Sequence, residues 1–182
     1  MSDVEESVVV GDEGDDINLS PSIRDALVAR REHIAANRFI DLDIPGYDSR
    51  LFCRYGLVDA KRLNAIGERI TKTIRERDER ALAAALDTLI AACDEFFVRH
   101  NGREIPLREV IEQDEPVRYS TELAEFLKFD TELPETPTAR SVCKALFMDN
   151  EIAIAAHNHQ LSRWMMGNET DVFQEMLETD PL

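Results

Sequence analysis

A long apolar stripe between Glu79 and Gly102 constrains the fold more than any other feature of this sequence. Its large apolar side chains recur at helical spacing, and alanines fill several of the positions between them. The members of the stripe are Leu82, Leu86, Leu89, Cys93, Phe96 and Phe97. Because a helix that is apolar around much of its circumference is usually buried, we predict a central helix that ends at Asn101-Gly102.

Helical periodicity and capping residues predict most of the remaining structure. We expect further helices over residues 20–37, 59–78, 119–129, 138–147, 150–166 and 170–178. Ser20, Asp59 and Thr138 are suited to cap three of these helices, because a short polar side chain can accept a hydrogen bond from a free backbone N–H. Gly167-Asn168 separates the last two helices.

The apolar period changes to two in FIDLDIPGYDSRLFCRYG, residues 39–56. Ile40, Leu42 and Ile44 alternate with Asp41 and Asp43, and a Pro-Gly turn precedes a second alternating run. This pattern predicts a β-hairpin with a loop longer than two residues. The expected fold class is mainly α, a single helical domain over residues 19–182 with one small N-terminal β-hairpin at about 39–56.

Acidic residues outnumber basic ones by 37 to 21, which gives the chain a formal net charge of −16. Residues 1–18 contain no lysine or arginine, and we expect them to form a flexible, disordered acidic arm. The charge argues against nucleic acid or an anionic membrane as the main partner. Two possibilities remain open, an acidic protein that handles aggregation-prone partners and a DNA mimic that occupies a basic groove.

We expect neither an export signal nor a membrane span in this chain. No apolar run approaches the about 20 residues that a membrane helix needs, and the N-terminus lacks the basic and apolar regions of a signal peptide. Three scattered cysteines, Cys53, Cys93 and Cys143, therefore fit reduced thiols in a cytosol.

The segment AAHNHQLSRWMMGN raises the question of a metal site. His157 and His159 are two residues apart, which places them about 200° apart on a helix, so one face cannot direct both to a metal. Asp41 and Asp43 could share a strand face and hold Mg²⁺, but a solvated face is the better interpretation. With no P-loop and no nucleophile elbow, we expect no enzyme, no cofactor and no metal. Bound zinc or manganese in purified protein would revive a metal-dependent enzyme.

One predicted helix carries a basic face in an otherwise acidic chain. Its clearest members are Arg62, Arg69 and Lys72, and Glu68 can pair with Lys72 four residues on. The simpler interpretation is an exposed face with local ion pairs. The alternative is intermolecular, with the basic face of one copy meeting the acidic arm of another.

Several segments, read in order, resemble the tail assembly chaperones of long-tailed, siphovirus-type phages of actinobacteria. They are FIDLDIPGYDSRLFCRYGLVD, REIPLREVI, RYSTELAEFLKF and TARSVCKALFMDNEIAIAAHNHQLSRWM, which together cover roughly Phe39 to Gly167. The shared features are an aspartate-rich strand, a Pro-Gly turn, an Arg-Tyr strand end, a Thr-Ala-Arg helix start and a closing Trp-Met. No single motif is specific, and the long acidic arm departs from the family pattern.

The resemblance implies a chaperone without catalysis that binds the tape measure protein in the host cytoplasm. Such a protein keeps the tape measure protein soluble, helps to recruit tail tube subunits and is not expected in the mature virion. The resemblance also implies a longer form made by ribosomal frameshifting, and the ending TDPL would match the short form. We further expect a homo-oligomer. The alternatives are an acidic DNA-mimic inhibitor of a nuclease or regulator, and a structural virion protein.

The expected contact residues are large, adaptable side chains. Methionine and tryptophan are common at protein interfaces, so we predict a client or self-association groove from five residues. They are Trp164, Met165, Met166, Phe96 and Phe97.

Overall fold

The computed structural model describes the backbone of residues 21–36 and 38–178 and the side chains of residues 23–29, 31–32 and 38–167. The chain divides into two compact units, Met1–Ala35 and Ala36–Leu182. Helix α1 (Pro21–Ala36) confirms the helix predicted over residues 20–37. The predicted acidic arm and the predicted cap Ser20 lie outside the described residues.

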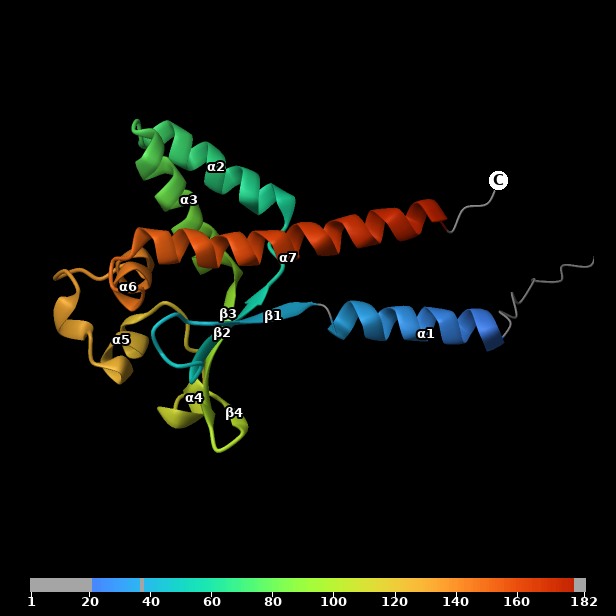
Figure 1. Cartoon of the computed structure of the whole chain (residues 1–182), viewed down its shortest axis with the longest axis horizontal. Coiled ribbons are helices and arrows are strands. Elements are labelled where there is room, and N and C mark those ends of the chain that lie inside the picture. The colour runs from blue at the N-terminus through green and yellow to red at the C-terminus, as the bar shows by residue number, and fades with distance from the viewer. Residues whose placement is uncertain (1–20, 37, 179–182) are drawn as a thin grey trace, which may run out of the picture. The chain divides into compact units, whose positions relative to one another are not determined.

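The second unit contains a four-stranded antiparallel sheet in the order β1-β2-β3-β4 (Figure 1). The strands are β1 (Phe39–Asp43), β2 (Leu51–Gly56), β3 (Cys93–His100) and β4 (Arg103–Pro106). β1 and β2 form the predicted hairpin, with Phe39 opposite Gly56 and Asp43 opposite Phe52. In the loop between them Gly46 has a φ of +90°, a conformation that residues with a side chain rarely adopt.

The fold is mixed α/β, so the prediction of a mainly α fold with one hairpin is correct only in part. Helices predominate and the hairpin is present, but the hairpin belongs to a four-stranded sheet that was not predicted. The predicted central helix ends at Ala92 as α3 (Arg77–Ala92), and the chain continues directly as strand β3. Because β3 lies inside the sheet and is largely buried on both faces, its apolar residues do not alternate with polar ones. The expected stop at Asn101-Gly102 is instead the turn into β4, where both residues have a positive φ.

The described part of the second unit also contains six α-helices and a short 3-10 helix. They are α2 (Ala60–Thr73), α3, α4 (Leu107–Val110), α5 (Thr121–Leu127), η1 (Asp130–Glu132), α6 (Ala139–Leu146) and α7 (Glu151–Glu178). Two predicted caps are confirmed, since Asp59 accepts a hydrogen bond from the Arg62 N–H at 2.8 Å and Thr138 accepts one from the Ser141 N–H at 3.2 Å. The predicted break at Gly167-Asn168 is wrong, because α7 runs through it. A glycine inside a helix costs only about 1 kcal/mol, which need not end the helix.

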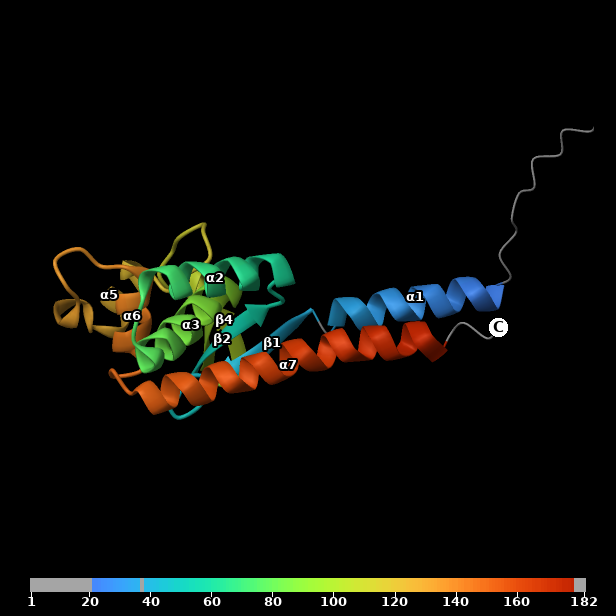
Figure 2. The same ribbon diagram turned by 90° about the horizontal axis from the view of Figure 1, so that it is seen from above.

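The core of the second unit lies between the sheet and the helices that cover one of its faces. Figure 2 shows α3 lying between α2 and α7, and α3 packs against both. The sheet contributes Tyr55 and Phe96 to this core, α3 contributes Leu89, and α7 contributes Ile154 and Leu161, all of them fully buried. Within the described part of the chain, no helix is both long enough and apolar enough to cross a membrane.

Candidate functional site

The histidine-containing segment of α7 belongs to a buried hydrogen-bonded chain. His157 is only 2% exposed, and its Nε2 lies 3.0 Å from the Tyr55 hydroxyl, which lies 2.6 Å from the Tyr119 hydroxyl. Burial lowers the pKa of His157 to about 4, so its ring is neutral near pH 7. His159 is exposed on another side of α7, in agreement with the spacing of two. This segment is therefore a packed helix face.

The three cysteines are free and buried. The Sγ atoms of Cys53 and Cys93 lie 3.4 Å apart across the β2–β3 pair. Burial raises the pKa of Cys143 to about 12 and also raises the pKa of Cys53, so these thiols stay protonated. No group of three or more histidine, cysteine, aspartate or glutamate side chains in the described residues is arranged to hold a metal ion.

The sheet face opposite Tyr55 carries two stacked phenylalanines under two arginines. The rings of Phe52 and Phe97 stack with centroids 5.1 Å apart. The Arg99 guanidinium carbon lies 4.2 Å from the centroid of Phe52, and that of Arg54 lies 4.4 Å from the centroid of Phe97. Cation–π contacts of this kind keep the arginines flat on the aromatic pair and cover it.

Carboxylates on β1 and β4 fix the two arginines in place. Asp41 accepts two hydrogen bonds from Arg54, each of 2.8 Å, while Asp43 and Glu104 both accept hydrogen bonds from Arg99. The hydrogen bond from Arg99 lowers the pKa of Asp43. Asp41 and Asp43 are both exposed, so the predicted solvated strand face is confirmed.

The five predicted contact residues do not form one continuous surface. Phe96 is fully buried on the helix side of the sheet, and Phe97, on the other side, is 8% exposed. On α7, Trp164 is half-buried against the core, Met165 is buried, and Met166 is 58% exposed. Of the five, Trp164 and Met166 therefore offer the most surface to a partner.

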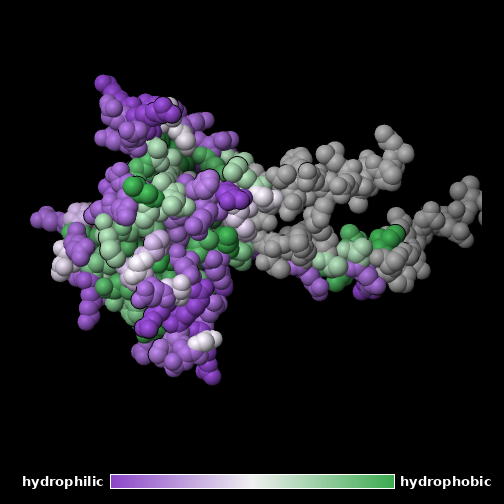
Figure 3. Space-filling model, viewed as in Figure 1, coloured by the Kyte–Doolittle hydropathy of each residue, from purple (hydrophilic) through white to green (hydrophobic). Residues whose placement is uncertain are grey.

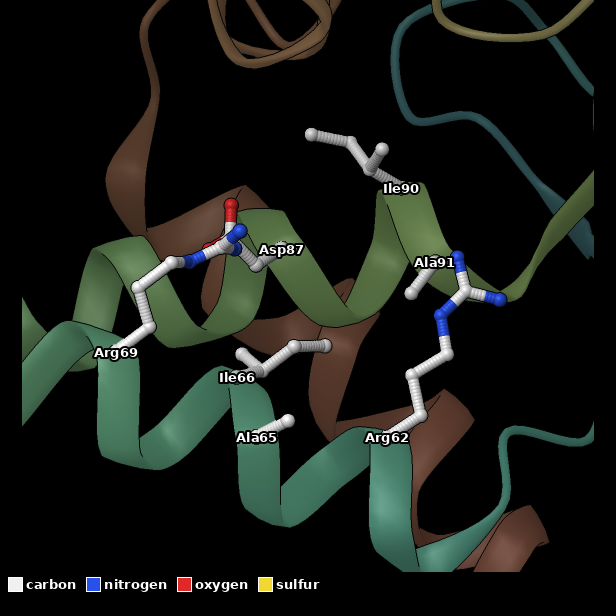
Figure 4. A pocket seen from close by; sticks show the side chains of 7 residues that line it. All are labelled: Arg62, Ala65, Ile66, Arg69, Asp87, Ile90 and Ala91. Carbon is white, nitrogen blue, oxygen red and sulfur yellow. The ribbon is translucent and has the colours of Figure 1, made fainter.

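Two of the three predicted basic-face residues line a hollow between α2 and α3 (Figure 4). Arg62 and Arg69 point from α2 toward α3, on either side of Ile66, and the hollow has a volume of about 450 Å³. Lys72 lies outside this hollow and pairs with Glu68 at 3.8 Å, which confirms the predicted local ion pair.

Asp87 of α3 is the buried anchor of this region. It accepts one hydrogen bond of 2.6 Å from Arg69 and two of 2.5 Å from Arg140 of α6. Burial alone would raise the pKa of Asp87, but the hydrogen bonds from Arg140 and Arg69 outweigh it and hold the pKa below its ordinary value. Asp87 therefore ties α2 and α6 to α3. This role could not be predicted from the sequence, because Asp87 lies inside an apolar helix and its partners are distant in the chain.

An apolar groove of about 470 Å³ lies where β2, β3 and β4 meet the turn around Tyr47 and the helices α4 and α5. Leu51, Val98 and Ile105 come from the strands, and Val110 and Phe126 come from the helices. Val110 is 41% exposed and Phe126 is 36% exposed.

Charged and polar side chains flank this apolar groove. Arg50, Arg99 and His100 lie among its lining residues. Figure 3 shows hydrophilic residues over the tips at α2 and at the β3–β4 turn, with hydrophobic residues gathered between them. The groove could not be predicted from the sequence, because its lining comes from five separate segments of the chain. The one sequence feature that could have indicated the groove is Phe126, a large apolar residue at the edge of the buried face of its helix.

No family model, no curated protein and no solved structure matches this chain.

Proposed function

We propose that this chain is a phage tail assembly chaperone that binds the tape measure protein without catalysis. The observation that carries the proposal is the apolar groove, in which Val110 and Phe126 remain exposed beside apolar strand residues. The order of the segments between Phe39 and Gly167 supports the same function through its resemblance to such chaperones.

The groove suits an apolar helix of an aggregation-prone client. Its volume of about 470 Å³ falls in the range of small-molecule pockets, enough for one or two large side chains, and its wall is mostly apolar. A client helix would place apolar side chains at successive turns between Val110 and Phe126. Burying apolar surface contributes about 25 cal/mol per Å², so covering these two side chains favours binding. Arg50 at the rim would favour acidic residues beside the client's apolar face.

Client binding would also explain how the protein works as a chaperone. An apolar client helix held in the groove is removed from the pool that aggregates, and the bound state is stabilised by mass action. The half-buried Trp164 and the exposed Met166 on α7 remain candidates for a second contact, with client, with tail tube subunits or with a longer form of the same chain.

The proposal is tested by coexpressing the full chain with the tape measure protein of the same phage and measuring the soluble fraction of the client. Val110→Glu and Phe126→Glu place a charge in the groove, and we expect each to reduce the soluble client by about tenfold. Ile152→Glu is the matched control, because Ile152 is 82% exposed on α7 and does not line the groove. Trp164→Ala tests the second contact in the same assay.

A wild-type level of soluble client with both groove variants would overturn the assignment of the groove. A pull-down of the tagged chain from infected cells tests the function itself. Recovery of the tape measure protein, tail tube subunits or an extended form of the chain supports it. Recovery of a nuclease or a transcription regulator instead would refute it and favour the DNA-mimic alternative.

A further inference from the structure

The hollow between α2 and α3 continues into a second hollow that is also lined by arginines. The second hollow has a volume of about 470 Å³ and shares Arg62, Ile90 and Ala91 with the first. Arg38, which precedes β1, and Arg118, which precedes α5, line it as well. We call the two joined hollows the arginine groove.

The arginine groove carries an excess of positive charge in a chain whose formal net charge is −16. Its charged lining residues are Arg38, Arg62, Arg69, Arg118, Asp87 and Asp94. Four arginines against two aspartates leave a formal excess of two positive charges. This concentration of one sign on a chain of the other sign points to an anionic ligand.

The cations of the groove differ in whether a carboxylate already binds them. Arg69 is held by Asp87, whereas Arg118 donates from Nε to the backbone carbonyl of Asp94 at 3.0 Å. Within the described residues, no carboxylate pairs with the guanidinium of Arg62 or Arg38. These two side chains, with Arg118, are therefore available to an incoming acidic group.

We propose that the arginine groove binds the acidic N-terminal segment, residues 1–18, of a second copy of this chain. The segment contains seven acidic residues and no lysine or arginine. These acids are Asp3, Glu5, Glu6, Asp12, Glu13, Asp15 and Asp16. The sign and density of charge in the segment complement the groove.

The apolar content of the segment also matches the groove. Val8–Val10 separates the acidic residues into two groups. In the groove, Leu57 is 51% exposed and Phe39 is 39% exposed, and both line the hollow that contains Arg38 and Arg62. An apolar run between two acidic groups can therefore cover exposed apolar side chains while its carboxylates meet the arginines.

The length of α1 limits how many of these acidic residues the same chain could bring to its own arginine groove. α1 has 16 residues, which at 1.5 Å per residue separates its two ends by about 24 Å. Five residue steps from Pro21 back to Asp16 span at most about 17 Å when fully extended. The backbone of Asp16 in the same chain therefore falls short of Arg38, beyond the far end of α1, whereas Glu5, sixteen residue steps before Pro21, could span more than about 50 Å. A second copy can bring all seven acidic residues to the arginine groove together, and the mass of the crosslinked product tests this assignment.

The test uses the full chain with a photo-crosslinking amino acid in place of Leu57. Irradiation is expected to give a product of twice the chain mass, with the crosslink in residues 1–18 by mass spectrometry. Arg62→Glu should lower the yield about fivefold, because an ion pair is replaced by repulsion. Salt at 1 M should remove most of the product, since it shortens the Debye length to about 3 Å.

Matched controls make the result specific to the groove. Arg103→Glu reverses another exposed arginine, on β4 and outside the groove, and should leave the yield unchanged. Because the Arg62 side chain has no hydrogen bond or ion pair to the described residues, its replacement should leave the circular dichroism spectrum unchanged. A crosslink of single-chain mass, a crosslink outside residues 1–18, or an unchanged yield in Arg62→Glu would each overturn the proposal.

Discussion

The buried histidine of α7 predicts a loss of stability in mild acid. His157 is 2% exposed and faces the Tyr55 hydroxyl, and burial lowers its pKa from 6.5 to about 4. The unfolded chain therefore binds a proton at a pH where the folded chain does not. By linkage, the stabilising effect of the neutral ring is complete above pH 6.5 and is lost progressively as the pH falls from 6.5 toward 4.

The size of this effect follows from the two pKa values. A shift of one pKa unit corresponds to about 1.4 kcal/mol, so His157 accounts for about 3 kcal/mol over the whole window. Between pH 7.5 and pH 5 the expected loss is about 2 kcal/mol. That loss is a large share of the free energy of unfolding of an ordinary domain, about 5–15 kcal/mol.

Urea unfolding at pH 7.5 and pH 5.0 measures the loss, with the fluorescence of Trp164, the single tryptophan, as the signal. Glutamine can keep a hydrogen bond to Tyr55 but does not titrate, so His157→Gln should remove about 2 kcal/mol of the pH dependence. His159→Gln is the control, because His159 lies two residues away on the same helix and is exposed. Equal pH dependence in the wild type and in His157→Gln would refute the reasoning, since carboxylates would then account for all of it.

Three further predictions concern other buried groups. Asp87→Asn should lower the free energy of unfolding by about 1–3 kcal/mol in thermal or urea melts, because two arginines lose a buried charged acceptor. Cys53, Cys93 and Cys143 should react with a thiol reagent only after denaturant is added, and rapid labelling of the folded chain would contradict their burial. Phe52→Ala should cost about 3–5 kcal/mol in the same melts, because Phe52 has no exposed surface although it lies on the sheet face away from the helices.

Elements whose signal is local were predictable from the sequence. The hairpin over residues 39–56 depends on strict alternation and a Pro-Gly turn, and both act over a few neighbouring residues. The caps at Asp59 and Thr138 likewise need only a short polar side chain and the backbone three residues on. In these segments the tertiary structure reinforces the local preference.

Strand β3 was not predictable from periodicity, because its residues are largely buried on both faces of the sheet. The helical spacing of apolar residues in α3 continues beyond Leu89 through Cys93, Phe96 and Phe97. The apolar stripe therefore shows no change of period where the helix ends and strand β3 begins. The aromatic and β-branched residues of this run, Phe96, Phe97 and Val98, favour a strand by local preference. A preference of this kind is weaker than the apolar pattern from which we predicted the helix.

Because residues 93–100 form a strand and not a helix, their side chains alternate between the two faces of the sheet. On a helix, Phe96 and Phe97 would be neighbours on one side, and a single groove could contain both. On β3 they alternate, so Phe96 enters the core and Phe97 stacks on Phe52 beneath Arg54. The same alternation turns Val98 back to the helix side, where it lines the apolar groove.

Unlike Phe96 and Phe97, Arg62 and Arg69 lie on one side of their element. They are seven residues apart on helix α2, which is about two turns of the helix. Their common direction was predictable, but the acceptor was not, since Asp87 lies on a different helix and comes close only through packing of the second unit. Asp87 binds Arg69 and leaves Arg62 without a carboxylate in the described residues, so the packing divides one basic face into two functions. Arg69 stabilises the contact of α2 with α3, and Arg62 is left for the acidic partner that we propose. Replacing each arginine separately should therefore lower the stability in one case and the crosslinking yield in the other.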